Sequence, residues 1–316
     1  MVKEKKKVIL IAGPTAVGKT GLSVELAKRI GGEIISADSM QVYRDMNIGS
    51  AKIKKEEMQG IPHYLIDILN PDDEFNVAIF QQKARGAIEC ITKNGHIPII
   101  VGGTAFYIQA LLYGIDFTEE DHDKEYREFL YQIGQQEDGE NILFDMLLKV
   151  DPHYAETVHK NNVKRVVRAL EYHHFTGRIF SEYNEIQRNQ EAEYQFCYFA
   201  LNDVRERLYE RINLRVDQMV KEGLVTEVKE LRDKGYQRNL VSMQGLGYKE
   251  IYAYLEGEIT LDEAIEIIKR DTRHFAKRQL TWLRRERDII MIDKEKYNYD
   301  EEKILREMLN KIKEIL

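Results

Sequence analysis

Residues 6–20 read KKVILIAGPTAVGKT, and this stretch decides the fold class. The apolar run VILIA at residues 8–12 is short and continuous, which is typical of a strand buried on both faces of a parallel sheet. GPTAVGKT at residues 13–20 matches the pattern G-x-x-x-x-G-K-S/T, in which backbone N–H groups at a helix start surround phosphate oxygens. Leu22 and Leu26 follow at helical spacing. The stretch therefore predicts a strand, a phosphate-binding loop and a helix.

Strand and helix patterns alternate through the residues that follow. Further strand segments occur at 33–39 (EIISADS), 63–69 (HYLIDIL) and 97–103 (IPIIVGG), and helical patterns occur at 77–95 and 104–114. Alternation of this kind is typical of a parallel sheet flanked by helices. We therefore expect an α/β protein with a P-loop NTPase-like parallel sheet.

The pattern changes near residue 117. Residues 117–196 begin with charged side chains and show no strand pattern before YQFCYFAL at 194–201. Helices are expected instead, at 126–133, 142–150, 153–158 and 163–175. We expect residues 1–116 and 197–316 to form the P-loop α/β catalytic core with C-terminal helices, and residues 117–196 to form a helical insertion domain.

The composition sets broad limits on function. The chain has 316 residues, 43% of them hydrophobic, and a net charge of −7. The total charge gives no sign of nucleic-acid binding and does not exclude it, because local basic patches decide such binding. Cys90 and Cys197 stand in apolar segments without a Cys/His cluster, which argues against a zinc site. No apolar run approaches the ~20 residues of a membrane span, so we expect a soluble, cytoplasmic protein with no membrane partner.

Each residue type of GPTAVGKT has a physical role in holding phosphate. Gly13 and Gly18 let the backbone N–H groups turn inward, Lys19 adds a full charge, and the Thr20 hydroxyl is placed to ligate Mg²⁺. Taken alone, such a loop is typical of ATP or GTP binding. The candidate phosphate-binding residues are Gly13, Pro14, Thr15, Ala16, Val17, Gly18, Lys19 and Thr20.

The second acid of a nucleotide-hydrolysis site is poorly represented. That acid normally ends an apolar strand and helps to hold Mg²⁺. The segment IPIIV instead ends in Gly102 and Gly103. Asp67 lies in the middle of its own predicted strand, where a local structural role is expected. The sequence thus predicts a phosphate site without the usual hydrolysis apparatus.

Asp38 directly follows the strand segment EIISA. In an open parallel sheet, ligands bind beyond the carboxyl ends of the strands, so Asp38 is expected to face the space near the phosphate loop. A carboxylate there can accept a proton from an attacking group. Asp is equally favoured as a cap of a turn or helix, and the pattern alone leaves both interpretations open.

Six motifs occur in an order that resembles a known enzyme family. They read GPTAVGKT, ADSMQVYRDMNIGSAK, PIIVGGT, NNVKRVVRALEYHHFTG, QGLGYKEIYAYLEGEI and FAKRQLTWLRR. On these motifs the chain resembles the tRNA dimethylallyltransferases, also called tRNA isopentenyl transferases, over nearly its whole length. Ser50 stands where the family usually has threonine. The residues of the zinc finger found in longer relatives are missing, so the chain looks like the shorter, bacterial-type form.

The resemblance implies transfer of a dimethylallyl group from dimethylallyl diphosphate to tRNA, with release of diphosphate. The acceptor is the exocyclic amine of the adenosine 3′-adjacent to the anticodon. Asp38 matches the family's general base, which this poor nucleophile needs because its lone pair is delocalised. Lys19, the loop N–H groups and Mg²⁺ at Thr20 would stabilise the leaving diphosphate. Arg215 matches a family arginine at the diphosphate and completes the implied catalytic set.

The resemblance also implies contacts with the anticodon stem-loop of tRNA. The DSMQ segment grips the target base, which must leave its stack to be reached. Residues 269–287 hold eight basic and two acidic side chains, a local net charge of +6 that suits RNA phosphates, although a solvated helix face is the alternative for any single member. The implied tRNA contacts are Asp38, Ser39, Met40, Gln41, Thr104, Arg127, Lys164, Arg165, Val166, Val167, Arg168, Gln244, Gly245, Leu246, Gly247, Tyr248, Lys249, Lys277, Arg278 and Arg284.

Three other functions stay open at this point. A small-molecule kinase could use the same loop, with Asp38 activating an acceptor hydroxyl. Prenyl transfer to a free adenine nucleotide would not depend on tRNA. A non-catalytic RNA-binding module would not need intact Lys19, Thr20 and Asp38. We expect the tRNA-dependent enzyme, acting as a monomer.

Overall fold

The computed structural model describes residues 5–115 and 124–316. The chain divides into two compact units, one formed by Met1–Leu112 with Glu193–Leu316 and the other by Tyr113–Ala192. Each unit is built around its own arrangement of elements.

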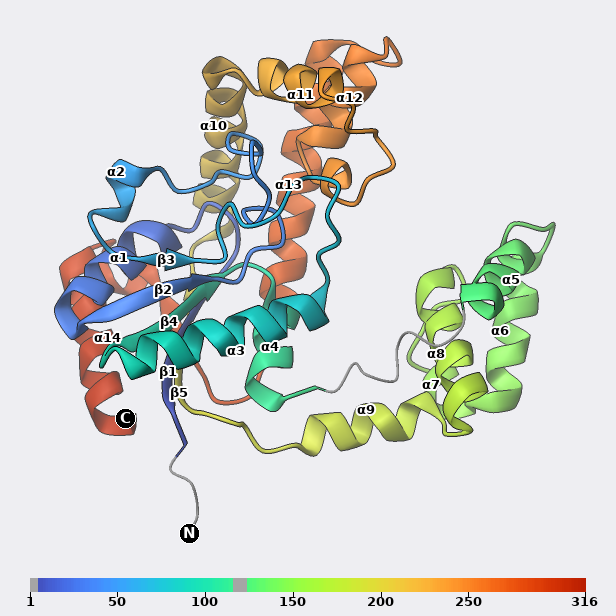
Figure 1. The fold of residues 1–316 in the computed structure, drawn as a ribbon, viewed down its shortest axis with the longest axis horizontal. Coiled ribbons are helices and arrows are strands. Elements are labelled where there is room, and N and C mark those ends of the chain that lie inside the picture. Colours follow the sequence, from blue (N-terminus) through green and yellow to red (C-terminus); the bar gives the residue numbers. More distant parts are fainter. Residues whose placement is uncertain (1–4, 116–123) are drawn as a thin grey trace. The chain divides into compact units, whose positions relative to one another are not determined.

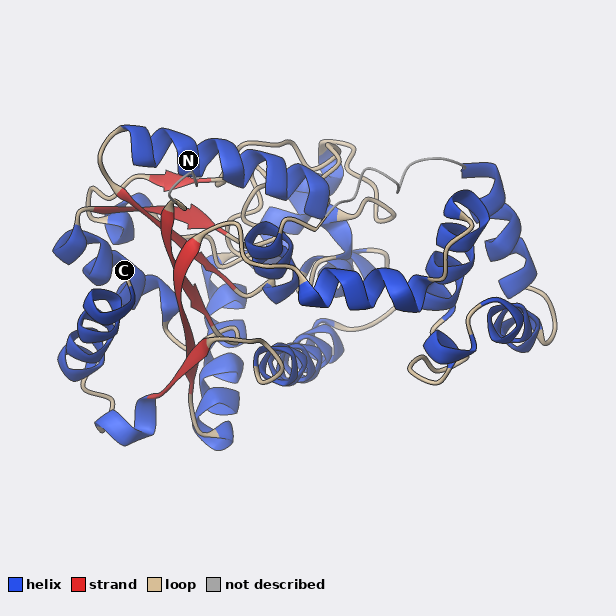
Figure 2. Ribbon diagram, turned by 90° about the horizontal axis from the view of Figure 1, so that it is seen from below, coloured by secondary structure: helices blue, strands red, loops and turns tan. Residues whose placement is uncertain are grey.

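A six-stranded sheet with all strands parallel forms the centre of the first unit (Figure 2). Its order is β3–β2–β4–β1–β5–β6. The strands are β1 (Lys7–Ala12), β2 (Gly32–Ser36), β3 (His63–Tyr64), β4 (Ile97–Gly102), β5 (Gln195–Asn202) and β6 (Ile289–Asp293). The predicted α/β fold with a P-loop-type parallel sheet is confirmed.

Helices cover both faces of this sheet (Figure 1). α1 (Lys19–Ile30) and α14 (Glu301–Ile315) pack on one face, and α3 (Val77–Lys93) packs on the other. Ile9 and Ile11 of β1 lie in one buried cluster with apolar side chains of α1 and α14. The continuous apolar run of β1 is therefore explained by burial on both faces.

The first unit has further helices. They are α2 (Lys55–Met58), α4 (Ala105–Tyr113), α10 (Arg205–Glu222), α11 (Leu224–Asp233), α12 (Tyr248–Leu255) and α13 (Leu261–Leu283), with 3-10 turns η2 (Ser242–Gln244) and η3 (Lys294–Tyr297). α13 packs against both α10 and α12. Through this packing, residues of α13 such as Gln279 lie next to the phosphate loop.

Two parts of the sheet differ from the prediction. The strand expected at 63–69 is only β3, because Leu65 and Asp67 take left-handed φ values of 64° and 55° that interrupt the ladder. Asp67 accepts a hydrogen bond from the buried Lys52 ammonium, which is the structural role expected for it. β6 was not predicted, although four of its five residues (IIMID) are apolar, because so short a run between helical segments cannot be assigned to a strand by periodicity alone.

The second unit is helical. Its helices are α5 (Lys124–Gly134), α6 (Gly139–Val150), α7 (Pro152–Ala155), α8 (Val163–Thr176) and α9 (Phe180–Asn189). Leu130, Leu143 and Leu147 form its core together with apolar side chains of α8. All four predicted helices are present, and α9 was missed because it is short and only Phe180, Tyr183 and Ile186 of its 10 residues are apolar or aromatic.

The ends of the second unit can be compared with the predicted insertion at 117–196. The first predicted boundary, at residues 116 and 117, lies outside the described residues. At the other end the chain re-enters the first unit at Glu193, whose N–H donates to the Leu112 carbonyl at 2.8 Å. This hydrogen bond places the return slightly earlier in the sequence than predicted.

Candidate active site

The phosphate loop joins β1 to α1 in a conformation that orients its backbone. Gly18 caps α1 with a φ of 98°, a left-handed value that glycine adopts without strain. Two N–H groups of the loop are used inside the protein. That of Thr15 donates to Gln279 Oε1 at 2.9 Å, and that of Val17 donates to the Pro14 carbonyl at 3.4 Å. These two groups are therefore not available to a bound anion.

The remaining donors of the loop are free for phosphate. The N–H groups of Ala16 and Gly18 have no hydrogen-bond partner within residues 5–115 and 124–316. Those of Lys19 and Thr20 lie in the first turn of α1, where a helix supplies no acceptor. The positive end of the α1 dipole acts in the same direction. The loop therefore offers a set of donors that only an external anion can satisfy.

Lys19 is held against the loop by two hydrogen bonds. Its ammonium donates to the carbonyls of Gly13 and Pro14, each at 2.8 Å. Burial lowers the pKa of Lys19 to about 8, against the opposing charge of Asp38, and the neighbouring Arg215 adds to the decrease. An anion in the loop would favour the charged form of Lys19 and raise this pKa again.

Asp38 caps a turn and also lines the site, so both interpretations of its position apply. Its Oδ1 accepts from the N–H of Met40 at 2.8 Å and from that of Gln41 at 3.3 Å. Its Oδ2 has no hydrogen-bond partner in the described part of the chain, and the side chain is half-buried. One oxygen thus fixes the carboxylate while the other can accept a proton.

Gly102 explains why the strand next to β1 ends without an acid. A Cβ atom on Gly102 would lie 2.1 Å from the Ala37 carbonyl oxygen, so the backbone before Asp38 occupies the space of a side chain. The Ala37 N–H in turn donates to the Val101 carbonyl at 2.8 Å. The glycine therefore lets β4 support the segment that presents Asp38.

Arg215 on α10 is an unpaired charge beside the loop. It is half-buried and has no hydrogen bond or ion pair among the described residues. Burial lowers the pKa of Arg215, the charge of Arg211 adds to this effect, and the charge of Glu57 opposes it. A buried cation without a partner is costly, so this arrangement favours an incoming anion.

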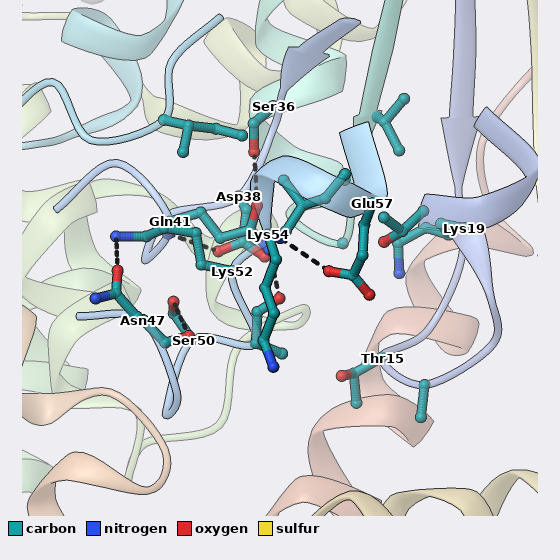
Figure 3. Close-up of a pocket in the computed structure, with 18 of the residues that line it drawn as sticks. Thr15, Lys19, Ser36, Asp38, Gln41, Asn47, Ser50, Lys52, Lys54 and Glu57 are labelled. Atoms are coloured by element: carbon teal, nitrogen blue, oxygen red, sulfur yellow. Dashed lines mark hydrogen bonds between the residues drawn. The ribbon is translucent and has the colours of Figure 1, made fainter. Parts of the chain in front are cut away.

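These groups surround one cavity of about 820 Å³. Figure 3 shows Thr15 and Lys19 on one side of it and Asp38, Gln41 and Asn47 on the other. Arg215 lines the same cavity. Its apolar lining comes from Ile34, Ile48, Ile53, Ile66, Val101, Met219 and Phe275. The cavity can therefore hold a molecule that is anionic at one end and hydrocarbon at the other.

Gln279 on α13 is a site residue that the sequence analysis missed. Its Oε1 accepts from the Thr15 N–H, and its Nε2 donates to the Gly103 carbonyl, both at 2.9 Å. The side chain is buried and lines the cavity. One amide thus joins the phosphate loop to the turn after β4. A lone glutamine between basic residues carries no sequence signal for this role.

Replacing Gln279 with leucine is expected to destabilise the protein by about 1–3 kcal/mol, because the Thr15 N–H and Gly103 carbonyl would lose their partners. The KM for the diphosphate substrate should rise several-fold, because the freed loop is less ordered. Urea unfolding and steady-state kinetics measure the two effects. Gln218→Leu, on the exposed side of the same cavity, is the matched control, and equal behaviour of the two variants would contradict the assigned role.

Glu227 on α11 fixes the segment that follows Asp38. Its Oε2 accepts from the N–H groups of Asn47 and Ile48 at 2.9 and 2.7 Å, and its Oε1 accepts from that of Gly49 at 3.0 Å. The Tyr248 hydroxyl donates to the same Oε1 at 2.8 Å. This buried carboxylate was also missed, because its partners are backbone groups far away in the sequence.

Three of the expected tRNA contacts have side chains that face the protein interior. Tyr248 is fully buried against Gly49, where a Cβ atom would lie 2.5 Å from the tyrosine ring. Val166 and Val167 belong to the core of the second unit. The side chains of these three residues pack inside the protein, and the expected tRNA contact at their positions stays a prediction that these side chains do not support.

The other expected tRNA contacts are distributed over both units. Arg127 forms an ion pair with the buried Glu171 at 2.7 Å, and Lys249 lies 3.4 Å from Glu250. Exposed members are Lys164, Arg165, Gln244, Lys277, Arg278 and Arg284. Half-buried or buried members are Ser39, Met40, Gln41, Thr104, Arg168, Gly245, Leu246 and Gly247. Met40 contacts the glycine-rich segment, since a Cβ atom on Gly245 would lie 2.5 Å from its methyl group.

The fold and the site together define a class of protein. Glycines replace the acid that a nucleotide hydrolase places after the strand beside its phosphate loop. A carboxylate instead lies across a partly apolar cavity from the loop. This arrangement defines a P-loop transferase that moves a group from a phosphate-bearing donor.

Comparison with known proteins gives the family. The IPP transferase family profile matches residues 41–286, and the isopentenyl transferase profile matches residues 6–72. A tRNA dimethylallyltransferase of Lachnoclostridium phytofermentans is 58% identical over 301 residues, which are 95% of this chain and 96% of the relative. The chain belongs to the tRNA dimethylallyltransferase (IPP transferase) family.

Solved structures agree with this assignment. The full-length tRNA isopentenylpyrophosphate transferase of Bacillus halodurans has a TM-score of 0.71 and 44% identity, covering 98% of this chain and 99% of that one. A eukaryotic dimethylallyltransferase acting on tRNA has a TM-score of 0.77 and 32% identity, covering 91% and 74%. The resemblance inferred from the six motifs is confirmed.

Proposed function

We propose that this protein transfers the dimethylallyl group of dimethylallyl diphosphate to the exocyclic amine of the adenosine 3′-adjacent to the anticodon in tRNA, releasing diphosphate. One observation carries the proposal. The free N–H donors of the phosphate loop, the Asp38 carboxylate and a set of apolar side chains line a single cavity. A kinase would require a pocket for a nucleotide base and no apolar passage between phosphate and acceptor. Membership of the family supports the same reaction.

The donor binds with its diphosphate in the loop and its hydrocarbon tail against the apolar lining. As the carbon–oxygen bond breaks, negative charge grows on the diphosphate oxygen that leaves. Lys19, Arg215 and the loop N–H groups stabilise this charge more in the transition state than in the bound substrate. The proposed diphosphate-binding residues are those of 13–20 with Arg215, and Thr15 contributes through its place in the loop rather than through its N–H.

The acceptor amine approaches from the side of Asp38. Oδ2 takes the proton of the amine as the carbon–nitrogen bond forms, while Oδ1 keeps its two backbone hydrogen bonds. The positive charge that would otherwise remain on the nitrogen is thereby removed. Ser39, Met40 and Gln41 are proposed to hold the extruded base next to this carboxylate.

Mg²⁺ is the proposed cofactor, and the residues present fit it. The part of the chain that the structure describes has no group of three or more His, Cys, Asp or Glu side chains that could hold a metal ion. Thr20 is exposed and lines the cavity, so its hydroxyl is free to ligate a cation. Mg²⁺ commonly takes one or two protein oxygens and completes its shell with phosphate oxygens and water. When bound, it would neutralise part of the diphosphate charge.

The tRNA is proposed to contact both units through their exposed basic side chains. Lys164 and Arg165 lie at the start of α8 in the insertion, with no acid in the first turn. Lys277 and Arg278 lie on α13 in the first unit. Such charges bind the phosphate backbone without reading sequence. We propose that the insertion meets the anticodon arm and that a monomer acts in the cytoplasm. Within the described chain no helix combines the length and apolarity needed to traverse a bilayer.

The test is a transfer assay with labelled dimethylallyl diphosphate and Mg²⁺. Unmodified tRNA and AMP are offered as separate acceptors. We expect label in tRNA, at the adenosine 3′ of the anticodon, and none in AMP. Label in AMP alone would replace the proposal with prenyl transfer to a free nucleotide. Consumption of ATP with a small acceptor, and no prenyl transfer, would establish a kinase instead.

A further inference from the structure

Three arginines of α10 share one helix face at i, i+4 and i+8. Arg207 has two partners of its own, since its Nε lies 3.7 Å from Asp203 and its guanidinium lies 3.7 Å from the centre of the Tyr299 ring. Arg211 has no ion pair or hydrogen bond within the described residues. Arg215, discussed above, lines the cavity. On this face Arg211 therefore lies between Arg207, which has partners within the protein, and Arg215, which is proposed to bind the diphosphate.

Lys294 reaches the same place from the opposite end of the chain. It follows β6 directly, is only 5% exposed, and donates to the Val17 carbonyl at 3.3 Å. Its nearest acid, the exposed Glu301, is 4.0 Å away. An ammonium has three donors, and this one has a single carbonyl acceptor, with the carboxylates of Glu301 and Asp203 as more distant counter-charges. A nearly buried lysine is rarely left with so little compensation.

Arg211 and Lys294 both lie close to the phosphate loop at Gly18. A Cβ atom on Gly18 would lie 3.1 Å from Lys294 Nζ and 3.6 Å from an Arg211 guanidinium nitrogen. Neither residue lines the cavity, so both approach the loop from its outer side. Burial lowers the pKa of Lys294, the charges of Arg211 and Arg207 add to the decrease, and the carboxylates of Glu301 and Asp203 oppose it. A negative charge inside the loop would offset the repulsion between Lys294 and Arg211.

We propose that Arg211 and Lys294 form a second row of positive charge behind the phosphate loop, which strengthens the binding of diphosphate without touching it. The inference rests on the proposed function, since it deepens the assignment of the loop to the diphosphate. The two residues are positioning residues that act through the electrostatic field at Gly18. In a partly buried site this field is weakly screened by solvent, so each charge has a measurable effect at the loop.

Binding of inorganic pyrophosphate with Mg²⁺, followed by calorimetry, tests the proposal without any prenyl transfer. We expect Arg211→Gln and Lys294→Gln each to weaken pyrophosphate binding about five- to tenfold, and the salt dependence of binding to become shallower. Arg211→Lys should stay within about threefold of the wild type, because the charge is kept. Arg207→Gln is the matched control on the same helix face and should change pyrophosphate affinity by less than about twofold.

Other outcomes would overturn the proposal. Unchanged pyrophosphate affinity in Arg211→Gln would contradict the proposal that the second row strengthens diphosphate binding. An equal loss in Arg211→Gln and Arg211→Lys, with an unchanged salt dependence, would show a role in packing only. Should the buried Lys294→Gln variant fail to fold, Arg211→Gln and Arg211→Lys still decide the matter. If the variants change pyrophosphate binding as expected but the protein modifies no tRNA, the role of the second row is supported and the proposed function is contradicted.

Discussion

Replacement of Asp38 by asparagine is expected to lower kcat for prenyl transfer by about three orders of magnitude, the scale of a lost general base. An asparagine oxygen can still accept from the N–H groups of Met40 and Gln41, so the turn is preserved. The amide cannot take the proton of the acceptor amine. Single-turnover assays with saturating tRNA and donor measure the chemical step directly.

Substrate binding should be nearly unaffected in the same variant. The Kd for tRNA is expected to stay within a few-fold of the wild type, because the carboxylate contributes little to the many contacts along the phosphate backbone. Asp72→Asn, an exposed acid outside the cavity, is the control and should keep full activity. Loss of tRNA binding in a folded Asp38→Asn protein would make Asp38 a binding residue instead of the base.

Replacement of Lys19 by methionine is expected to lower kcat/KM for dimethylallyl diphosphate by about 10³. The apolar chain fills the same space but provides no charge to the leaving diphosphate, where electrostatic stabilisation is commonly the largest catalytic contribution. Affinity for tRNA should not change. Steady-state kinetics with varied donor measures the effect, and Lys28→Met on the exposed face of α1 is the control. A Lys19→Met enzyme with near-normal kcat/KM would exclude Lys19 from the reaction.

The lowered pKa of Lys19 gives this site a pH dependence of defined sign. Below pH 8 the free enzyme carries the ammonium, because its pKa is about 8. Diphosphate binding requires that charge and raises the pKa in the complex, so affinity is kept below pH 8 and falls as the pH rises above it, by up to about tenfold per unit. Pyrophosphate titrations between pH 7 and 9.5 measure this trend. The Lys19→Met variant should lack it.

Local sequence patterns predicted most of the architecture, but not β6 or α9. VILIA and GPTAVGKT predicted β1, the loop and α1, because burial on both faces and helix capping are encoded within a few adjacent residues. Asp38 could be placed at the cavity because ligands of parallel sheets bind beyond the carboxyl ends of the strands. The expectation of C-terminal helices within residues 197–316 is met by α10 and α13, among others.

Contacts between distant segments could not be predicted from such patterns. Gln279 reaches Thr15 across most of the chain, and Glu227 binds backbone N–H groups that have no side-chain signature. Lys294 follows a five-residue edge strand, and nothing in the adjacent sequence indicates that its ammonium reaches the Val17 carbonyl. The burial of Tyr248 was unexpected because a glycine-rich segment beside a lysine is typical of an exposed loop. In each case the deciding information is the packing of one helix or strand against another.

The carboxylate of Glu227 has a consequence for the direction in which a substrate enters the cavity. Successive backbone N–H groups can form a concave nest that captures anions, and the N–H groups of residues 47–49 bind the Glu227 carboxylate in this way. Asn47 lies across the cavity from Thr15 and Lys19 (Figure 3), so the donors on that side already carry a negative charge of the protein's own. The free N–H donors for a diphosphate lie at the phosphate loop, which favours one of the two head-to-tail orientations of the donor substrate.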